Sequence, residues 1–122
     1  MDKDSKVILI TGSRKGIGNY LVKYYTKLGN RVIGCSRKNI ESSIYNYEHF
    51  CLDVSDEKEV KRMFKKIRNS YGSLDILINN AGIASMNHSL LTNMETVNKV
   101  FSTNVFGTFL FCREAVKLMR KN

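Results

Sequence analysis

Short apolar runs alternate with segments of helical periodicity along this chain. Between and after the runs, apolar residues recur every three or four positions, which is the period of an amphipathic helix. Strands that alternate with helices predict right-handed βαβ units and a parallel sheet. The fold class is therefore α/β, a doubly wound parallel sheet of which this chain holds the first four strands in the spatial order 3-2-1-4. The four predicted strands cover residues 6–11, 31–35, 48–52 and 74–78.

Two helices are predicted between these strands. The first begins after a glycine-rich turn, ends at Gly29-Asn30, and carries an apolar stripe of Ile17, Leu21, Tyr24, Tyr25 and Leu28. The second is capped by Ser55 or Asp56, stops at Gly72, and buries Val60, Met63, Phe64, Ile67 and Tyr71. The polar stretch 38–47 is a connector, with or without a short helix, and residues 79–92 form a loop.

A last, long helix is predicted to begin near Asn93 or Met94. One face of it carries Val97, Phe101, Asn104, Thr108, Phe111 and Ala115, and Phe106, Phe109 and Leu110 lie off that face. A helix that is apolar nearly all round must be covered on more than one side, and nothing later in the chain can cover this one. We therefore expect a single nucleotide-binding domain over residues 1–122, truncated at the C-terminus and pairing with a second copy through the last helix.

Composition and charge narrow the function classes. A chain of 122 residues with 43% hydrophobic and 25% charged residues has room for one globular domain. No apolar run approaches the roughly 20 residues that span a membrane. The net charge of +9 permits a nucleic-acid binder, but acids lie between the bases on the predicted helices, so we expect solvated helix faces and no nucleic-acid partner. Three dispersed cysteines argue against a metal site or disulfides and favour the cytoplasm: Cys35, Cys51 and Cys112.

The turn after the first strand has the composition of a pyrophosphate-binding turn. Gly12 lets the chain leave the strand tightly, Gly16 admits the ligand's backbone, and Gly18 lets helix and strand pack closely. The free N–H groups that open the helix then point at the phosphates, helped by the positive end of the helix dipole. The candidate phosphate-binding residues are Gly12, Ser13, Arg14, Lys15, Gly16, Ile17 and Gly18.

This turn reads T-G-x-x-x-G-I-G and resembles that of the short-chain dehydrogenase/reductase family. Two later stretches share the resemblance: Asn79-Asn80-Ala81-Gly82 after the fourth strand, and the helix segment around Asn104. The resemblance implies a Rossmann-type fold and a nicotinamide cofactor. It places Asn80, Ala81 and Gly82 at a ribose, and Asp53 and Val54 at the adenine. It also gives Asn104 a supporting place in the catalytic set, where it holds a water of the proton relay.

Charge at the second strand bears on which cofactor is bound. An acid after that strand usually holds a free ribose 2′-hydroxyl, whereas nearby arginine accommodates a 2′-phosphate. Here the strand is followed by Arg37 and Lys38, with no carboxylate, and the family's pattern for NADP places basic residues at the positions of Lys15 and Arg37. We therefore predict NADP, with NAD second.

The family's catalytic tyrosine is followed four residues later by a lysine, which tunes the phenol as a general acid. None of the tyrosines in this chain has lysine at that position: Tyr20, Tyr24, Tyr25, Tyr45, Tyr47 and Tyr71. The catalytic serine, tyrosine and lysine are thus absent from this chain. The resemblance implies the cofactor-binding part of an NADP-dependent reductase of a carbonyl or 3-oxoacyl type, inactive alone. The alternative is a non-catalytic nucleotide-binding or interaction module.

Overall fold

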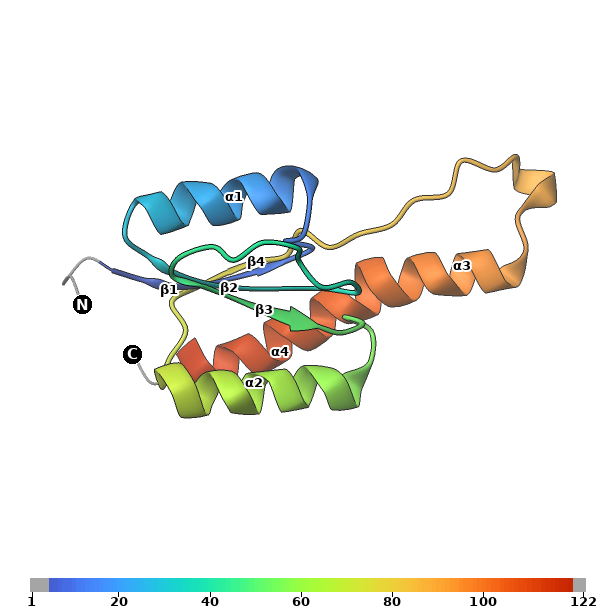
Figure 1. Cartoon of the computed structure of the whole chain (residues 1–122). Coiled ribbons are helices and arrows are strands. Elements are labelled where there is room, and N and C mark those ends of the chain that lie inside the picture. Colours follow the sequence, from blue (N-terminus) through green and yellow to red (C-terminus); the bar gives the residue numbers. More distant parts are fainter. Residues whose placement is uncertain (1–4, 120–122) are drawn as a thin grey trace.

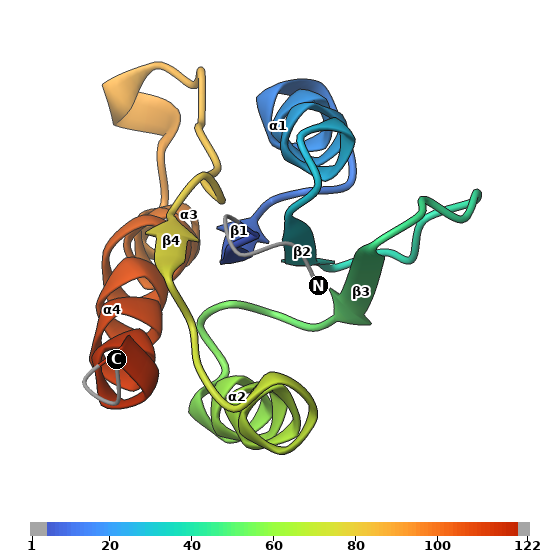
Figure 2. The ribbon, with the colours of Figure 1, turned by 90° about the vertical axis from the view of Figure 1, so that its left-hand side faces the viewer.

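The sheet consists of parallel strands in the order β3-β2-β1-β4, as the alternation of elements predicted. The computed structural model describes residues 5–119. Figures 1 and 2 show α1 over one face of the sheet, and α2 and α4 over the other. The strands are β1 (Val7–Thr11), β2 (Arg31–Ser36), β3 (Tyr47–Cys51) and β4 (Ile76–Ile78). The helices are α1 (Gly16–Lys27), α2 (Glu57–Tyr71), α3 (Met94–Phe101) and α4 (Thr108–Met119), with a 3₁₀ turn η1 (Ser89–Leu91) and a π-helical turn η2 (Ser102–Gly107).

Strand β1 lies at the centre of the core because β2 pairs with it on one side and β4 on the other. All its residues are buried, and successive side chains point to opposite faces of the sheet. Leu9 faces the larger core, which α2 and α4 cover. Ile8 and Ile10 face the smaller core, which α1 covers through Val22.

Helix α2 forms as its sequence predicted. The Asp56 carboxylate caps it by accepting a hydrogen bond of 3.2 Å from the Glu59 backbone N–H, and the chain leaves the helix at Gly72. Its buried face consists of Val60, Met63, Phe64 and Ile67, with Tyr71 half-buried at the end.

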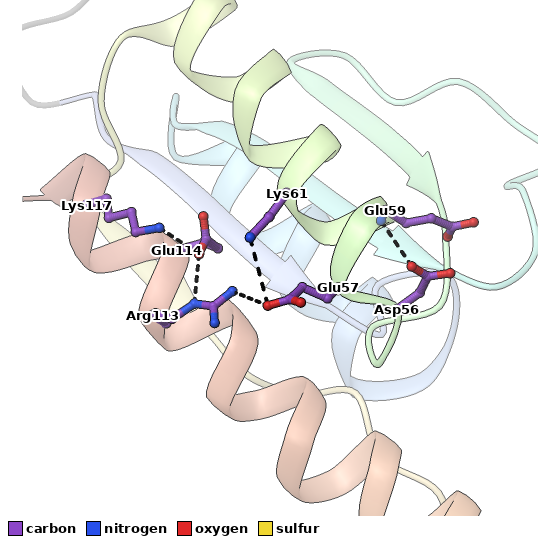
Figure 3. A network of polar contacts seen from close by, with 7 residues as sticks. All are labelled: Asp56, Glu57, Glu59, Lys61, Arg113, Glu114 and Lys117. Carbon is purple, nitrogen blue, oxygen red and sulfur yellow. Dashed lines mark hydrogen bonds and ion pairs between the residues drawn. The ribbon is translucent and has the colours of Figure 1, made fainter.

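Charged side chains join α2 to α4 (Figure 3). The Arg113 guanidinium donates to Glu57 of α2 at 2.9 Å and to Glu114 at 2.9 Å, and Lys117 donates to Glu114 at 2.9 Å. Glu114 is buried between the helices. The two cations are what allows a carboxylate to sit there, because a buried charge is tolerated only when it is paired.

The predicted stripe of α1 is wrong in part. Ile17, Tyr24 and Leu28 are exposed, and the helix buries Gly18 and Val22 instead, with Leu21 and Tyr25 half-buried. The helix approaches the sheet at Gly18, where no side chain intervenes. That contact rotates the true buried face away from the largest apolar residues.

The predicted long helix is interrupted. Residues 102–107 form the π-helical turn η2, which inserts an extra residue and shifts the helical period between α3 and α4. The residues buried after α3 are Thr103, Gly107, Leu110, Phe111, Glu114, Ala115 and Leu118. Phe101 and Asn104, predicted to lie on the buried face, are therefore exposed, whereas Leu110, predicted to lie off it, is buried.

Large apolar side chains remain at the surface of the α3–α4 segment. Their exposed fractions are about half or more, as for Phe109 at 60%. Beside them β4 forms one edge of the sheet (Figure 2). The exposed set is Met94, Phe101, Val105, Phe106, Phe109 and Val116. Among residues 5–119, no helix has the length and apolar character that crossing a membrane requires.

Candidate nucleotide-binding site

A cleft of about 570 Å³ lies at the carboxyl ends of the strands, where the chain segments that follow β1, β2, β3 and β4 come together. Such crevices are where open α/β sheets bind ligands. Nine of the thirteen predicted cofactor residues line it: Gly12, Arg14, Lys15, Gly16, Arg37, Val54, Asn80, Ala81 and Gly82. The other lining residues are Cys35, Ser36, Lys38, Leu52, Ile83 and Thr103.

The glycine turn is shaped by two requirements of the backbone. Gly16 has a φ of +62° and opens onto free space, so the chain can turn there and leave room above it. A Cβ at Gly18 would collide with the carbonyl oxygen of Gly12 and lie 2.7 Å from the Asn80 side-chain nitrogen. Gly18 is thus buried against the strand and the Asn80 amide, outside the cleft, and acts by close packing.

Helix α1 presents an uncapped N-terminus to the cleft. Lys15 occupies the capping position with extended backbone and provides no side-chain hydrogen bond, and the first turn contains no acid. The first N–H groups of the helix therefore keep their hydrogen-bonding capacity, and the helix dipole favours an anion there. Ile17 in the same turn is 71% exposed and does not line the cleft. This end of α1 can hold a phosphate.

Thr11 joins the glycine turn to the loop after β4. Its buried hydroxyl accepts hydrogen bonds of 2.9 Å from the backbone N–H groups of both Asn80 and Ala81, and the Asn80 amide donates to the Gly12 carbonyl at 3.1 Å. Thr11 was absent from the predicted site. The signal in the sequence was a hydroxyl-bearing residue at the last position of an otherwise apolar strand.

Ser13, predicted to bind phosphate, lies beneath the cleft and is buried. Its hydroxyl lies 2.5 Å from the Tyr47 hydroxyl and 3.4 Å from the Cys35 carbonyl. Tyr47 in turn contacts His49. Sequence reasoning gave neither Tyr47 nor His49 a role, because their proximity to the turn comes from the pairing of β2 with β3.

The loop after β2 carries the positive charge of the site. Arg37 and Lys38 line the cleft, and the Arg37 guanidinium lies 3.7 Å from the Asp53 carboxylate. Asp53 itself lines an adjoining hollow together with Arg37. Burial raises the pKa of Asp53, but hydrogen bonds from the Ser55 backbone and hydroxyl and the charge of Arg37 outweigh it and lower the pKa. Asp53 is therefore ionised at neutral pH.

Asn104 holds the loop after β4. Its side-chain oxygen accepts from the Ile83 N–H at 2.8 Å, and its nitrogen donates to the Ile83 carbonyl at 2.8 Å. The partner that its polar side chain requires is thus a backbone segment at the rim of the cleft. Within residues 5–119, His, Cys, Asp and Glu side chains form no cluster of three that could hold a metal ion.

Comparison with known proteins adds the family. The sequence profile described as short chain dehydrogenase matches residues 6–122. This chain belongs to the short chain dehydrogenase family. The 3-oxoacyl-[acyl-carrier-protein] reductase FabG of Escherichia coli is 30% identical over 99% of this chain and 52% of its own length. Members of the family that match this chain are oxidoreductases built on the NAD(P)-binding fold.

Solved structures superpose closely on this chain. A short chain dehydrogenase of Leptospira borgpetersenii with bound NAD⁺ is 32% identical, with a TM-score of 0.88 over 93% of this chain and 46% of that one. ElxO with bound NADP is 34% identical, with a TM-score of 0.86 over 96% of this chain and 51% of that one. The chain thus spans about half the length of these relatives, and of the two solved structures one holds NAD⁺ and the other NADP.

Proposed function

We propose that this chain is the nucleotide-binding part of an NADP-dependent oxidoreductase, which transfers a hydride between the nicotinamide and a carbonyl or alcohol substrate. One observation carries the proposal. The uncapped N-terminus of α1 opens into a cleft to which the segment after β2 contributes Arg37 and Lys38 and no carboxylate; the carboxylate near Arg37, at 3.7 Å, is that of Asp53 after β3. A dinucleotide with an additional 2′-phosphate matches both features, because each offers positive charge to a phosphate.

The cleft suits the other parts of such a nucleotide. In the proposal the pyrophosphate lies against the turn from Gly12 to Gly16, and the 2′-phosphate lies at the predicted basic pair of Lys15 and Arg37, with Arg14 of the turn beside it. Val54 and Asp53 face the adenine, and the segment 80–82 faces a ribose. The bound cofactor supplies the hydride, and the protein holds the cofactor and excludes water from it.

The remaining parts of the proposal follow from the family. Asn104 supports the proton relay, whereas the serine, tyrosine and lysine of the catalytic set are not among these 122 residues. The exposed apolar residues of the α3–α4 segment support pairing with a second copy. Three free thiols support a cytoplasmic location. The same exposed face would also serve a non-catalytic nucleotide-binding or interaction module, which is the alternative.

The test is a calorimetric comparison of NADPH and NADH on the 122-residue chain, with Arg37→Ala and a matched Arg62→Ala variant. Arg62 lies on α2, outside the cleft, so its loss removes the same charge elsewhere. A hydrogen bond to a charged group contributes about 1.5–3 kcal/mol, so Arg37→Ala should weaken NADPH binding roughly tenfold or more. NADH binding should change little in either variant. Equal affinity for both nucleotides would refute NADP specificity, and no binding to folded protein would favour the interaction module.

A further inference from the structure

A chain of hydrogen-bonded side chains runs beneath the floor of the cleft, from the glycine turn to the end of β2. The Ser13 hydroxyl lies 2.5 Å from the Tyr47 hydroxyl, which lies 2.5 Å from His49 Nδ1. On the other side of the imidazole ring, His49 Nε2 lies 2.7 Å from Ser36 Oγ and 3.2 Å from the Lys38 carbonyl. Ser36 Oγ also donates to that carbonyl. Ser36 and Lys38 line the cleft directly above.

The fold leaves room for this chain at Gly34. A Cβ at that position of β2 would collide with both Ser13 Oγ and the Tyr47 hydroxyl. The missing side chain is what lets a residue of the turn and a residue of β3 meet across β2.

The directions of the hydrogen bonds follow from the Lys38 carbonyl, where this series of hydrogen bonds ends. A carbonyl oxygen only accepts, so Ser36 donates its proton to Lys38 and its oxygen accepts from the Nε2–H of His49. A neutral imidazole has one N–H, so Nδ1 accepts from the Tyr47 hydroxyl. The Tyr47 oxygen then accepts from Ser13. Every donor has an acceptor in this state.

The protonated imidazole satisfies the same hydrogen-bonded groups, with the direction reversed only on the Nδ1 side. With N–H groups at both nitrogens, His49 donates to Tyr47 and to Ser36. Tyr47 then donates to Ser13, and Ser13 donates to the Cys35 carbonyl, which lies 3.4 Å away. Protonation of His49 therefore costs no hydrogen bond. It reverses the hydrogen bonds that run through Tyr47 to Ser13 in the turn, and it leaves the direction of those to Ser36 and Lys38 unchanged.

The groups packed around His49 come from the glycine turn, from β2 and the loop after it, and from β3. Burial lowers the pKa of His49, the hydrogen bond to the Lys38 carbonyl raises it, and the positive charge of Arg14 in the turn lowers it. Burial raises the pKa of Tyr47 and of Cys35 on β2 to about 12 in each case, so neither is charged at neutral pH. The charge that acts on His49 is thus the Arg14 guanidinium, which itself lines the cleft.

We propose that His49 is a positioning and specificity-determining residue for the phosphate at the 2′ end of the nucleotide. It holds Ser36 and the Lys38 carbonyl, and so fixes the loop that presents Arg37, and its protonation is linked to occupancy of that phosphate subsite. This inference rests on the proposed function, because it needs an anion beside Arg14 and Arg37.

The sign of the linkage follows from charge. A phosphate beside Arg14 offsets the positive charge that disfavours the imidazolium, so binding raises the pKa of His49 and takes up a proton. By reciprocity, NADPH affinity is higher below the pKa of free His49 and falls as pH rises through the pKa of the bound form. NADH, without the 2′-phosphate, shows less of this dependence.

The test is an NMR titration of the imidazole signals of the chain, free and saturated with NADPH or NADH. The sequence has two histidines, so His88→Gln, a change in the exposed loop after β4, leaves one signal to follow. NADPH should raise the pKa of His49 by half a unit to one unit more than NADH does. That corresponds to a threefold to about tenfold change in NADPH affinity across the interval.

The outcomes separate the two proposals. If NADPH binds in preference to NADH but both leave the pKa of His49 equal, the inference fails and the proposed function stands. If NADPH does not bind folded protein, both fail.

His49→Gln should reduce the preference for NADPH and leave only the pH dependence of the phosphate itself, whose second pKa is about 6. Tyr47→Phe, which keeps the imidazole, should shift the pKa of His49 without removing the linkage. If either variant fails to fold, the NMR result on the chain that keeps His49 and Tyr47 decides.

Discussion

Thr11→Val tests whether one hydroxyl holds the two halves of the nucleotide cleft together. Threonine and valine have the same shape, so the substitution removes an acceptor without opening a cavity. Thr11 is buried, with 1% of the residue exposed. Its hydroxyl accepts hydrogen bonds from the backbone N–H groups of Asn80 and Ala81, each at 2.9 Å.

The magnitude follows from those two donors. A buried donor left without an acceptor costs about 1–3 kcal/mol. Asn80 and Ala81 are half-buried, so water can hydrogen-bond in part to their N–H groups and reduce this cost. We expect the free energy of unfolding to fall by about 2–4 kcal/mol. A chain of this length has a total stability of about 6–18 kcal/mol, so the loss is large enough to measure. Because the loop after β4 loses an attachment to β1, NADPH should also bind more weakly.

Urea denaturation followed by circular dichroism measures the change, with Thr11→Ser as the matched control. Serine keeps the acceptor and loses one methyl group, which costs about 0.8 kcal/mol. Thr11→Val should therefore be less stable than Thr11→Ser. If the valine variant equals or exceeds the serine variant in stability, the hydroxyl does not hold the loop, and the reasoning is refuted.

Two further changes test the packing of α4. Phe111→Ala should lower the free energy of unfolding, measured in urea, by about 3–5 kcal/mol, because this ring is fully buried and its centroid lies 5.5 Å from that of Phe64. Phe109→Ala, at the exposed surface, should lower it far less. Similar losses in the two variants would contradict the placement of Phe111 in the core. Burial raises the pKa of Glu114, but the hydrogen bonds and charges of Lys117 and Arg113 outweigh burial and lower the pKa below its usual value of 4.5. The ionised Glu114 therefore stabilises the fold above pH 4.5, and this stabilisation is lost as pH falls through the lowered pKa. The free energy of unfolding, measured as a function of pH, should fall less steeply at acid pH in Glu114→Gln than in the exposed control Glu41→Gln. An unchanged fall in Glu114→Gln would exclude Glu114 as its source.

Most of the cleft could be anticipated from the sequence because its parts are local. The glycine turn, the basic pair after β2 and the double asparagine each lie at the end of a strand that its own apolar residues define. Parallel strands bring such ends to one edge of the sheet, so spacing along the chain was enough to group them. Gly18 packs against the strand and Val54 lines the cleft, whereas the nucleotide contacts predicted for them stay predictions.

The sequence by itself determined the order of the elements, the end of α2 at Gly72 and the strand order, because apolar spacing and glycine stops act over a few residues. Periodicity alone predicted the buried face of α2, but only the tertiary structure decided which side of α1 and of the α3–α4 segment is buried. Periodicity says which residues share a face, but close approach at Gly18 and the π-helical turn at 102–107 set where that face points, and so Ile17 and Asn104 became exposed. The contact between Ser13 and Tyr47 joins residues 34 positions apart, across a strand that has no side chain at the crossing. Such contacts depend on the packed sheet and cannot be obtained from local pattern.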